Sequence, residues 1–352
     1  MKIFKRIFFT LLTILLLLVA GGFIITHFYG EEVKSFIIEQ LNKKLNTQVI
    51  IDPSDIDFTV LQNFPNASVE FKNVKVLEAI PRGKKDTLFK AGNISLQFNV
   101  VNLFQKNYRI KKIEIEDVSL KLKIYTDGSD NYHFLKELKD SSKTNFSFAL
   151  EKIVLKDVLL SYKNQKNKSD VSVKINSSKL KGEFSNEKYA MDVTGNVFVN
   201  HFKSDNVNYL SGKPIDFAAS FDVENDVYSI KNSSIKLADL KFESSGNINA
   251  SSKLTSLHLD LKGKDIDIQS VISLLPEKQK QKFSDYESGG NFYFTSEIYG
   301  SVDSPFIKAD FGIENGNIGE SESSVKLRSI NIEGKYQNQT SYDKHKKISE
   351  QE

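Results

Sequence analysis

A period-two alternation of apolar and polar residues, recurring along most of the chain, constrains the fold more than any other feature. Val69 and Phe71, for example, alternate with Ser68, Glu70 and Lys72. Successive side chains of a strand point to opposite faces, so this pattern predicts half-buried strands. The alternation recurs at 74–76, 93–100, 171–175, 191–199, 215–223, 235–242, 254–261, 291–299 and 306–313.

Turn-forming residues separate these segments, and long helical patterns between them are missing. The turn signals are Pro81-Arg82-Gly83, Asp127-Gly128, Gly246-Asn247 and Asn315-Gly316. Without helical crossovers, βαβ units are not expected. At the usual strand length roughly 18 strands fit along the chain. The sequence therefore predicts a mostly β protein.

Two short helices are expected to interrupt the strands. Residues 130–140 follow a turn and place Phe134, Leu135 and Leu138 together. Residues 268–283 begin with an apolar cluster, and Pro276 is expected to break or restart that helix.

An internal repeat lies in the first half of the chain. Residues 112–122 read KIEIEDVSLKL and residues 152–162 read KIVLKDVLLSY, so that Asp117 matches Asp157. In both copies the alternation slips by one residue at the Asp-Val pair. A slip of one in a period-two pattern predicts a bulge or a tight turn at that point. One architectural unit is therefore used twice.

The N-terminus carries a membrane-spanning pattern. Residues 7–25 form a 19-residue run in which 15 residues are hydrophobic, preceded by Lys2, Lys5 and Arg6 and followed by Glu31 and Glu32. A helix of this length is about 28 Å long, close to the thickness of the hydrocarbon core of a bilayer. The charge asymmetry places the N-terminus in the cytoplasm and the remaining chain across the membrane. The anchor positions are Ile7, Leu11, Leu15, Leu18, Phe23 and Ile25.

A cleaved signal peptide is the competing interpretation of this run. Val19-Ala20-Gly21 supplies small residues that a signal peptidase could accept, but the apolar run is longer than the usual signal core. An uncleaved signal anchor is therefore favoured, and the bulk of the chain is exported on either interpretation.

The chain divides into four expected regions. Residues 1–30 contain the cytoplasmic N-terminus and the anchor. Residues 31–140 begin with an amphipathic helix over 31–46 and continue into strands, and residues 141–333 continue the strands. Residues 334–352 are polar and without periodicity, which predicts a disordered tail.

Motifs that carry catalytic chemistry are absent from the sequence. The chain has no Cys, its five His are scattered, and no nucleophile elbow or phosphate-binding loop occurs. Asp127, Ser129 and Asn131 have the start of a calcium-loop spacing, but Leu138 at the closing position cannot bind calcium, so a polar turn is favoured. A net charge of +3 is too small to indicate a nucleic-acid partner. We expect no enzyme activity, cofactor or metal.

Many one-sided strands must bury their apolar faces in a closed barrel, in a two-sheet sandwich, or against a ligand held by a long curled sheet. An open apolar groove is stable in water only when something apolar, such as an acyl chain, occupies it. The repeat supplies the candidate lining residues, although the sequence leaves open whether these or the opposite phase face the groove. They are Ile113, Ile115, Val118, Leu120, Leu122, Ile153, Leu155, Val158 and Leu160.

The order of these segments resembles that of the AsmA family of bacterial envelope proteins. The resemblance is carried by the anchor and amphipathic helix, by several short motifs, and by their order over nearly the whole chain. The motifs are Asp55-Ile56-Asp57-Phe58, the stretch from Phe64 to Val74, the stretch from Tyr108 to Leu135, the stretch from Leu259 to Pro276, and the stretch from Gly290 to Ile318.

This resemblance implies a transmembrane helix followed by an elongated, curled antiparallel sheet with a few short helices, anchored in the inner membrane of a Gram-negative bacterium and lying in the periplasm. It implies a part in outer-membrane biogenesis, with phospholipid acyl chains as partners. A part in the targeting and assembly of outer-membrane proteins, with assembly proteins as partners, is the alternative. About 18 strands would extend on the order of 85 Å, so the chain is expected to be a short paralogue, a truncated member or part of a longer relay.

Overall fold

The structure is a computed structural model. It describes residues 47–59, 66–78, 86–99, 110–132, 150–183, 188–204, 207–250, 255–275, 277–302, 304–320 and 326–338. The predicted anchor, the predicted helix over 31–46, and most of the predicted helix over 130–140 lie outside these residues. Among the described residues, no helix has the length and apolar character needed to cross a membrane.

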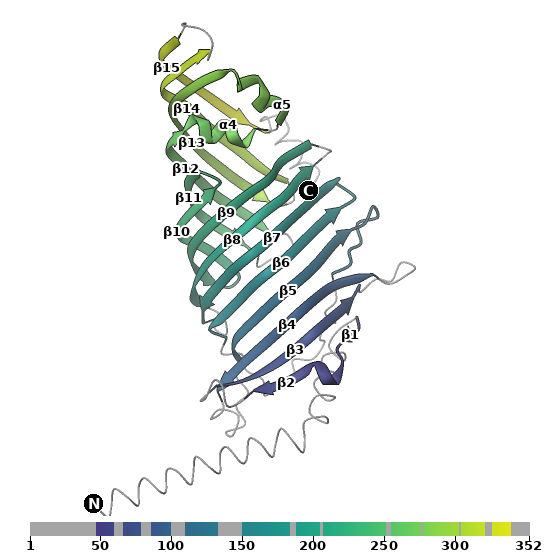
Figure 1. Cartoon of the computed structure of the whole chain (residues 1–352). Coiled ribbons are helices and arrows are strands. Elements are labelled where there is room, and N and C mark those ends of the chain that lie inside the picture. The colour runs from purple at the N-terminus through teal and green to yellow at the C-terminus, as the bar shows by residue number, and fades with distance from the viewer. Residues whose placement is uncertain are drawn as a thin grey trace, which may run out of the picture. The chain divides into compact units, whose positions relative to one another are not determined.

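The chain groups into two compact units, Met1–Asn167 and Lys168–Glu352. The described part of the first unit is almost entirely β (Figure 1). Its elements are β1 (Val49–Ile50), the 3-10 helix η1 (Pro53–Asp55), β2 (Ile56–Thr59), β3 (Asn66–Leu77), β4 (Thr87–Asn99), β5 (Ile110–Ile124) and β6 (Lys152–Asn164). The strands form an open sheet in the order β1-β3-β4-β5-β6, and β2 also pairs with β3.

The second unit is an open sheet that runs from β7 to β15 in chain order, with a helical insertion after β12. All its pairings are antiparallel, and the sheet curls so that β10 and β11 pass behind β7 and β8 in Figure 1. The strands are β7 (Ser169–Gly182), β8 (Lys188–Ser204), β9 (Val207–Glu224), β10 (Val227–Leu237), β11 (Leu240–Asn249), β12 (Ser256–Asp267), β13 (Tyr286–Ser301), β14 (Ser304–Glu320) and β15 (Lys326–Gln337). The helices are α4 (Ile268–Leu274), α5 (Glu277–Lys280) and η2 (Gln281–Phe283).

The expectation of a purely antiparallel sheet is wrong at one pairing. β5 and β6 are parallel, with Ile113 opposite Ile153 and Val118 opposite Val158. The two copies of the internal repeat therefore lie side by side with the same 40-residue offset as in the sequence. Parallel neighbours need a crossover of a dozen or more residues, and residues 125–151, which separate these two strands, are long enough to supply it.

The slip in the repeat is present, but as a kink at one left-handed residue in a continuous strand. The predicted bulge or tight turn is wrong, because the pairing has no register shift at this point. Asp117 has a φ of 54° and Asp157 a φ of 50°, in the left-handed region that Asp tolerates better than most residues. Asn73 of β3 has the same conformation, with a φ of 51°. Gly92 of β4 lies next to Asp117, since a Cβ on Gly92 would be 2.8 Å from that of Asp117. The kink therefore crosses β3 to β6 as a line.

Two predicted turns are wrong for a related reason. Gly246 lies inside β11 and Asn315 inside β14, and both have positive φ angles, of 117° and 52°. Gly246 and Asn315 supply left-handed positions within strands, and not the turns between strands that the Gly-Asn and Asn-Gly pairs predict. Conversely, the predicted strand over 235–242 is divided by a turn at Ala238 and Asp239.

The predicted helix over 268–283 is confirmed, and so is the prediction that it is interrupted near Pro276. The expected helix over 268–283 is present as α4, α5 and η2, and α4 ends before the position of Pro276. Asp267 caps α4 by accepting a hydrogen bond from the Gln269 backbone N–H at 3.0 Å. The predicted tail begins too early, because Gly334 to Gln337 are part of β15.

Candidate functional site: a half-exposed apolar face

All nine predicted lining residues lie on one face of the sheet of the first unit. Register partners in neighbouring strands share a face, and the kink at Asp117 and Asp157 keeps the apolar side chains before and after it on the same side. Rows of apolar side chains consequently cross β3 to β6. The rows are Val69–Leu96–Ile113–Ile153, Phe71–Ile94–Ile115–Leu155, Val74–Ala91–Val118–Val158 and Val76–Phe89–Leu120–Leu160.

The sheet does not bury this face completely. The row next to the kink is buried throughout, from Val74 and Ala91 to Val118 and Val158, and Val69 and Phe71 of β3 are also buried. The other seven of the nine residues keep an intermediate exposure, including Ile115 in the middle of the rows. In a two-sheet sandwich such inward positions form a closed core. This face is therefore an apolar surface that its own sheet leaves half open.

The opposite face of β5 and β6 carries charged side chains joined by ion pairs, together with the buried Val154 opposite Glu114. Lys156 contacts Glu114 and Glu116 at 2.5 Å each, and Glu114 also pairs with Lys112. Burial raises the pKa of Glu114, but hydrogen bonds from the two lysines outweigh it and lower the pKa to about 2. The hydrogen bonds of Glu114 and Glu116 in turn raise the pKa of Lys156. The pairing of the two strands thus combines apolar contacts on one face with charge pairs on the other.

A buried polar cluster fixes one end of the same strands. Asn131 is fully buried; it donates to the Glu78 carboxylate at 3.0 Å and to the Lys121 carbonyl at 2.9 Å, and it accepts from the Lys123 backbone N–H at 2.7 Å. Lys123 also contacts Glu78 at 2.9 Å and Asp86 at 3.0 Å. Burial lowers the pKa of Lys123, but hydrogen bonds to these two carboxylates raise it overall.

Asn131 therefore has a structural role that the sequence analysis missed. Its neighbours in the calcium-like spacing form the favoured polar turn: Asp127 accepts hydrogen bonds from the Ser129 backbone N–H at 3.0 Å and from its hydroxyl at 2.7 Å. Among the described residues, no group of three or more His, Asp or Glu is placed to hold a metal ion.

The second unit also has an apolar face, rich in phenylalanine. Phe242, Phe294, Phe292 and Phe311 form a chain of ring contacts across β11 to β14, with centroids 5.8, 6.1 and 6.4 Å apart. None of these four rings is buried, and Phe311 is exposed. Aromatic side chains usually supply core area, so a cluster left open to solvent is a surface suited to an apolar ligand.

Three of the phenylalanines on this face lie over glycines of the neighbouring strand. Gly195 is opposite Phe217, Gly263 opposite Phe294, and Gly334 opposite Phe311. A Cβ at each of these glycines would be 2.5 Å from a ring carbon of its partner. The missing side chain lets the ring lie flat against the backbone, which covers the glycine and keeps the apolar face smooth.

The helical insertion lies at one end of this face. Lys213 of β9 donates to the Ser273 carbonyl at 2.7 Å, near the C-terminus of α4. Gln269 at the start of α4 donates to the carbonyl and the hydroxyl of Ser288 in β13, both at 2.7 Å. α4 is therefore tied both to β13, which follows it in the chain, and to β9, which is several strands away.

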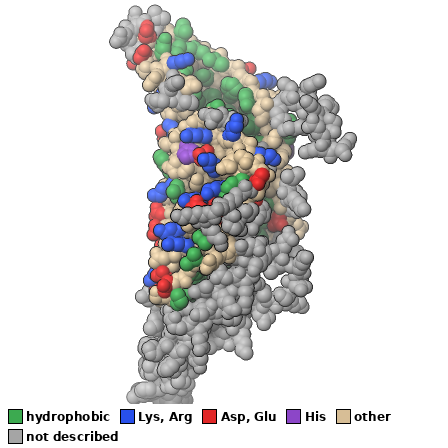
Figure 2. All heavy atoms as spheres, turned by 90° about the vertical axis from the view of Figure 1, so that its right-hand side faces the viewer, with side chains coloured by type: hydrophobic (Ala, Val, Ile, Leu, Met, Phe, Trp, Pro, Cys, Tyr) green, Lys and Arg blue, Asp and Glu red, His purple; other side chains and the backbone are tan. Residues whose placement is uncertain are grey.

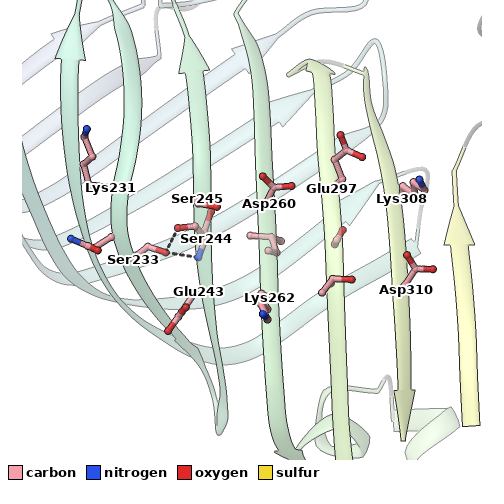
Figure 3. A pocket seen from close by; sticks show the side chains of 14 residues that line it. Lys231, Ser233, Glu243, Ser244, Ser245, Asp260, Lys262, Glu297, Lys308 and Asp310 are labelled. Carbon is pink, nitrogen blue, oxygen red and sulfur yellow. Dashed lines mark hydrogen bonds between the residues drawn. The ribbon is translucent and has the colours of Figure 1, made fainter.

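The polar face of the second unit has a shallow groove of about 680 Å³ across β10 to β14. Figure 3 shows the side chains along it, with the Ser233 hydroxyl bonded to the backbone of Ser244. The lining carries both signs of charge in similar numbers: Lys231, Lys262, Lys308, Glu243, Asp260, Glu297 and Asp310. Such a balanced, open groove is typical of a solvated sheet face and offers no site for an ion of either sign.

Chemically, the described residues offer apolar contact and no reactive constellation. In both units one face of the sheet is charged, and the other is a half-exposed face of aliphatic and aromatic side chains. This contrast is the main feature of the described residues. Searches of curated proteins and of solved structures return no match. A comparison with protein-family models matches residues 1–284, including both the repeat and the first half of the second unit. On that match, the chain belongs to the AsmA family.

Proposed function

We propose that this chain is anchored in the inner membrane of a Gram-negative bacterium and holds or conducts phospholipid acyl chains along its apolar face, as part of outer-membrane biogenesis and without enzyme activity. The observation that carries the proposal is the apolar face, whose rows continue over four neighbouring strands. Outside the buried row next to the kink, its side chains on β4, β5 and β6 are half exposed. The 19-residue apolar run near the N-terminus supports the anchor, and membership of the AsmA family supports the envelope location.

The mechanism is partition of acyl chains from a bilayer onto the protein. Each methylene left in water would cost about 0.8 kcal/mol, so ten methylenes lying along the rows avoid a cost of roughly 8 kcal/mol relative to water. Transfer from the bilayer itself is close to neutral, because the chains are out of water at both ends of the step. A surface of Ile, Leu, Val and Phe side chains has no polar group that fixes one position, so a chain can slide between rows. Charged groups on the other face keep the lipid to one side.

Two adjacent leucines of β6 provide the test. Leu160 is opposite Leu120 on the apolar face, whereas Leu159 is opposite Ser119 on the polar face and is exposed. A photo-crosslinking amino acid at position 160, in the full chain expressed in bacteria, should form phospholipid adducts detectable by mass spectrometry. The same probe at position 159 should form few. Equal labelling at the two positions, or none at position 160, would contradict the proposal.

A part in outer-membrane protein assembly is the second candidate, favoured by β15. This strand has 12 residues, and no described strand pairs with its outer edge. Leu327, Ile332 and Tyr336 on it are exposed. A long open edge with exposed apolar side chains can accept a strand from another protein. Crosslinks from position 327 to envelope proteins, together with no lipid adduct at position 160, would favour this function over lipid transport.

A further inference from the structure

One rim of the second unit gathers exposed large hydrophobic side chains. In an antiparallel sheet alternate connections lie at the same end, so the β8–β9, β10–β11, β12–β13 and β14–β15 connections share one rim, which also carries α4. We call it the α4 rim. The exposed large hydrophobic residues on it are Phe202, Val207, Tyr209, Phe283, Tyr286 and Leu327.

The opposite rim is formed by the remaining hairpin connections and differs in composition. Among the described residues, its exposed large hydrophobic side chains are Val302 and Tyr336. Large hydrophobic residues scattered singly over a surface need no explanation, but their concentration along one rim does. The six residues of the α4 rim come from three separate stretches of sequence, so no single apolar segment accounts for them.

The chemistry of the α4 rim is that of a membrane interface. Phe202 and Tyr209 pack at the end of the β8–β9 hairpin with ring centroids 5.8 Å apart. Exposed lysines flank the aromatic residues, among them Lys203, Lys280 and Lys282, and the exposed acids Asp285 and Glu287 lie on either side of Tyr286. Figure 2 shows hydrophobic side chains gathered toward the top of the view, with both basic and acidic side chains beside them. Aromatic rings between headgroups and lysines near anionic lipid are the usual anchors of proteins lying on a bilayer.

We propose that the α4 rim rests on the surface of an anionic phospholipid bilayer, inserting the aromatic end of the β8–β9 hairpin and the η2–β13 junction between headgroups. A bilayer is the occupant because the apolar run at residues 7–25 would tether the chain to one, which raises the local concentration of the membrane surface. This contact concerns the rim of the sheet and goes beyond the proposed transport along its face.

Two matched valines give the experiment. Val207 at the end of the β8–β9 hairpin is 52% exposed, and Val302 at the β13–β14 turn on the opposite rim is 49% exposed. The chain has no Trp. Val207→Trp and Val302→Trp therefore give single-tryptophan proteins in which one residue type reports from the two rims. Each full-length variant is reconstituted in vesicles of phosphatidylethanolamine and phosphatidylglycerol containing brominated phospholipid, which quenches indole on contact.

The expected result is that the Val207→Trp fluorescence falls by roughly half and shifts to the blue, as for an indole at the interface, while the Val302→Trp fluorescence is unchanged. Adding Phe202→Ser and Tyr209→Ser to the Val207→Trp protein should reduce the quenching, with circular dichroism as the check that the fold is kept. Equal quenching at the two positions, or none at position 207, would overturn the proposal. The readout is separate from lipid adducts at position 160, so this contact and lipid transport can fail independently.

Discussion

Asp117 of β5 and Asp157 of β6 occupy equivalent positions in neighbouring parallel strands, and both have left-handed backbone conformations, with φ angles of 54° and 50°. The pairs Glu116–Lys156 and Val118–Val158 lie on either side of them. The two kinks are therefore aligned. The apolar side chains that follow each kink lie on the same face of the sheet as those that precede it. The continuity of the apolar face depends on this one conformation in each strand.

Replacing Asp117 should show that dependence. The left-handed conformation costs roughly 1–2 kcal/mol for most L-residues, while Asp and Asn tolerate it better. Asp117→Val should therefore lower the free energy of unfolding by about 1–2 kcal/mol, whereas Asp117→Asn should stay within about 0.5 kcal/mol of the native protein. Urea denaturation followed by far-ultraviolet circular dichroism measures both. A valine variant as stable as the asparagine variant would show that the kink is not held by residue 117.

Substitution of alanine for glycine in the second unit should cost very different amounts of stability at different positions. At Gly195 a Cβ would meet the tip of the Phe217 ring at 2.5 Å, and that ring can swing away. Gly195→Ala should therefore cost only about 1 kcal/mol of overpacking, and less in a Phe217→Leu background. At Gly246 the Cβ would be 2.0 Å from the His258 carbonyl oxygen, and φ is 117°.

Neither the backbone at His258 nor the conformation at Gly246 can adjust cheaply, so Gly246→Ala should cost at least about 3 kcal/mol. Thermal unfolding of the two alanine variants, with the Phe217→Leu double variant as a cycle, tests the contrast. Similar losses of stability at positions 195 and 246 would contradict this contrast. They would mean that displacing the Phe217 ring costs as much as moving the His258 backbone away from Gly246.

The buried cluster around Asn131 should be a point of high sensitivity in the first unit. Asn131→Ala leaves the Lys123 N–H and the Lys121 carbonyl without the amide that bonds to them, and it removes a donor from the buried Glu78 carboxylate. Unsatisfied buried groups cost about 1–3 kcal/mol each, so a total loss of about 2–4 kcal/mol is expected.

Asn176→Ala is the matched control for this loss. The Asn176 amide donates to Asn196 at 2.5 Å, but in an exposed position where water replaces it. Its loss should therefore change stability by less than about 0.5 kcal/mol. Denaturation midpoints of the two variants compare them directly, and equal midpoints would contradict the role given to Asn131.

The sequence predicted the strands and the repeat because both depend on local alternation. The half-exposed rows of the first unit follow from Ile113, Ile115 and their copies, and the structure places them as the alternation requires. The kinks also have a local signature. A charged residue, then Asp, Asn or Ser, then an apolar residue recurs at Asn73, Asp117, Asp157, Asp265 and Ser329, all of which have positive φ. Only two of these positions were recognised in advance.

Other features depend on long-range contacts and could not be read from alternation. Gly246 and Asn315 look like hairpin residues in sequence, because a left-handed position inside a strand needs the same residue types as a tight turn. The parallel pairing of β5 with β6 depends on contacts between strands that a 27-residue connection separates, and alternation within each strand does not determine the direction of its neighbour. Asn131 looks like a turn residue, and only the approach of Glu78 and Lys123 from distant positions gives it a buried role.

The final prediction concerns acid stability. The pKa of Glu114 is about 2 in the folded protein and 4.5 in its ordinary state, because hydrogen bonds from Lys112 and Lys156 outweigh the effect of burial. A lowered carboxylate pKa gives stability that is fully present above the ordinary value and is lost as pH falls toward the folded value. The stability of the native protein should therefore decline between about pH 4.5 and pH 2 partly through this residue.

Glu114→Gln removes the titrating group while keeping its shape, so the variant should be less stable than the native protein at pH 7. The difference in stability between the two proteins, which we call the gap, should narrow steadily as pH falls below 4.5. Thermal unfolding at a series of pH values measures the gap. A difference between the two proteins that stays constant down to pH 2 would show that Glu114 does not gain its stability from the charged form. A narrowing gap would show that the charge of Glu114 stabilises the fold through its two partners, Lys112 on the same strand and Lys156 on β6.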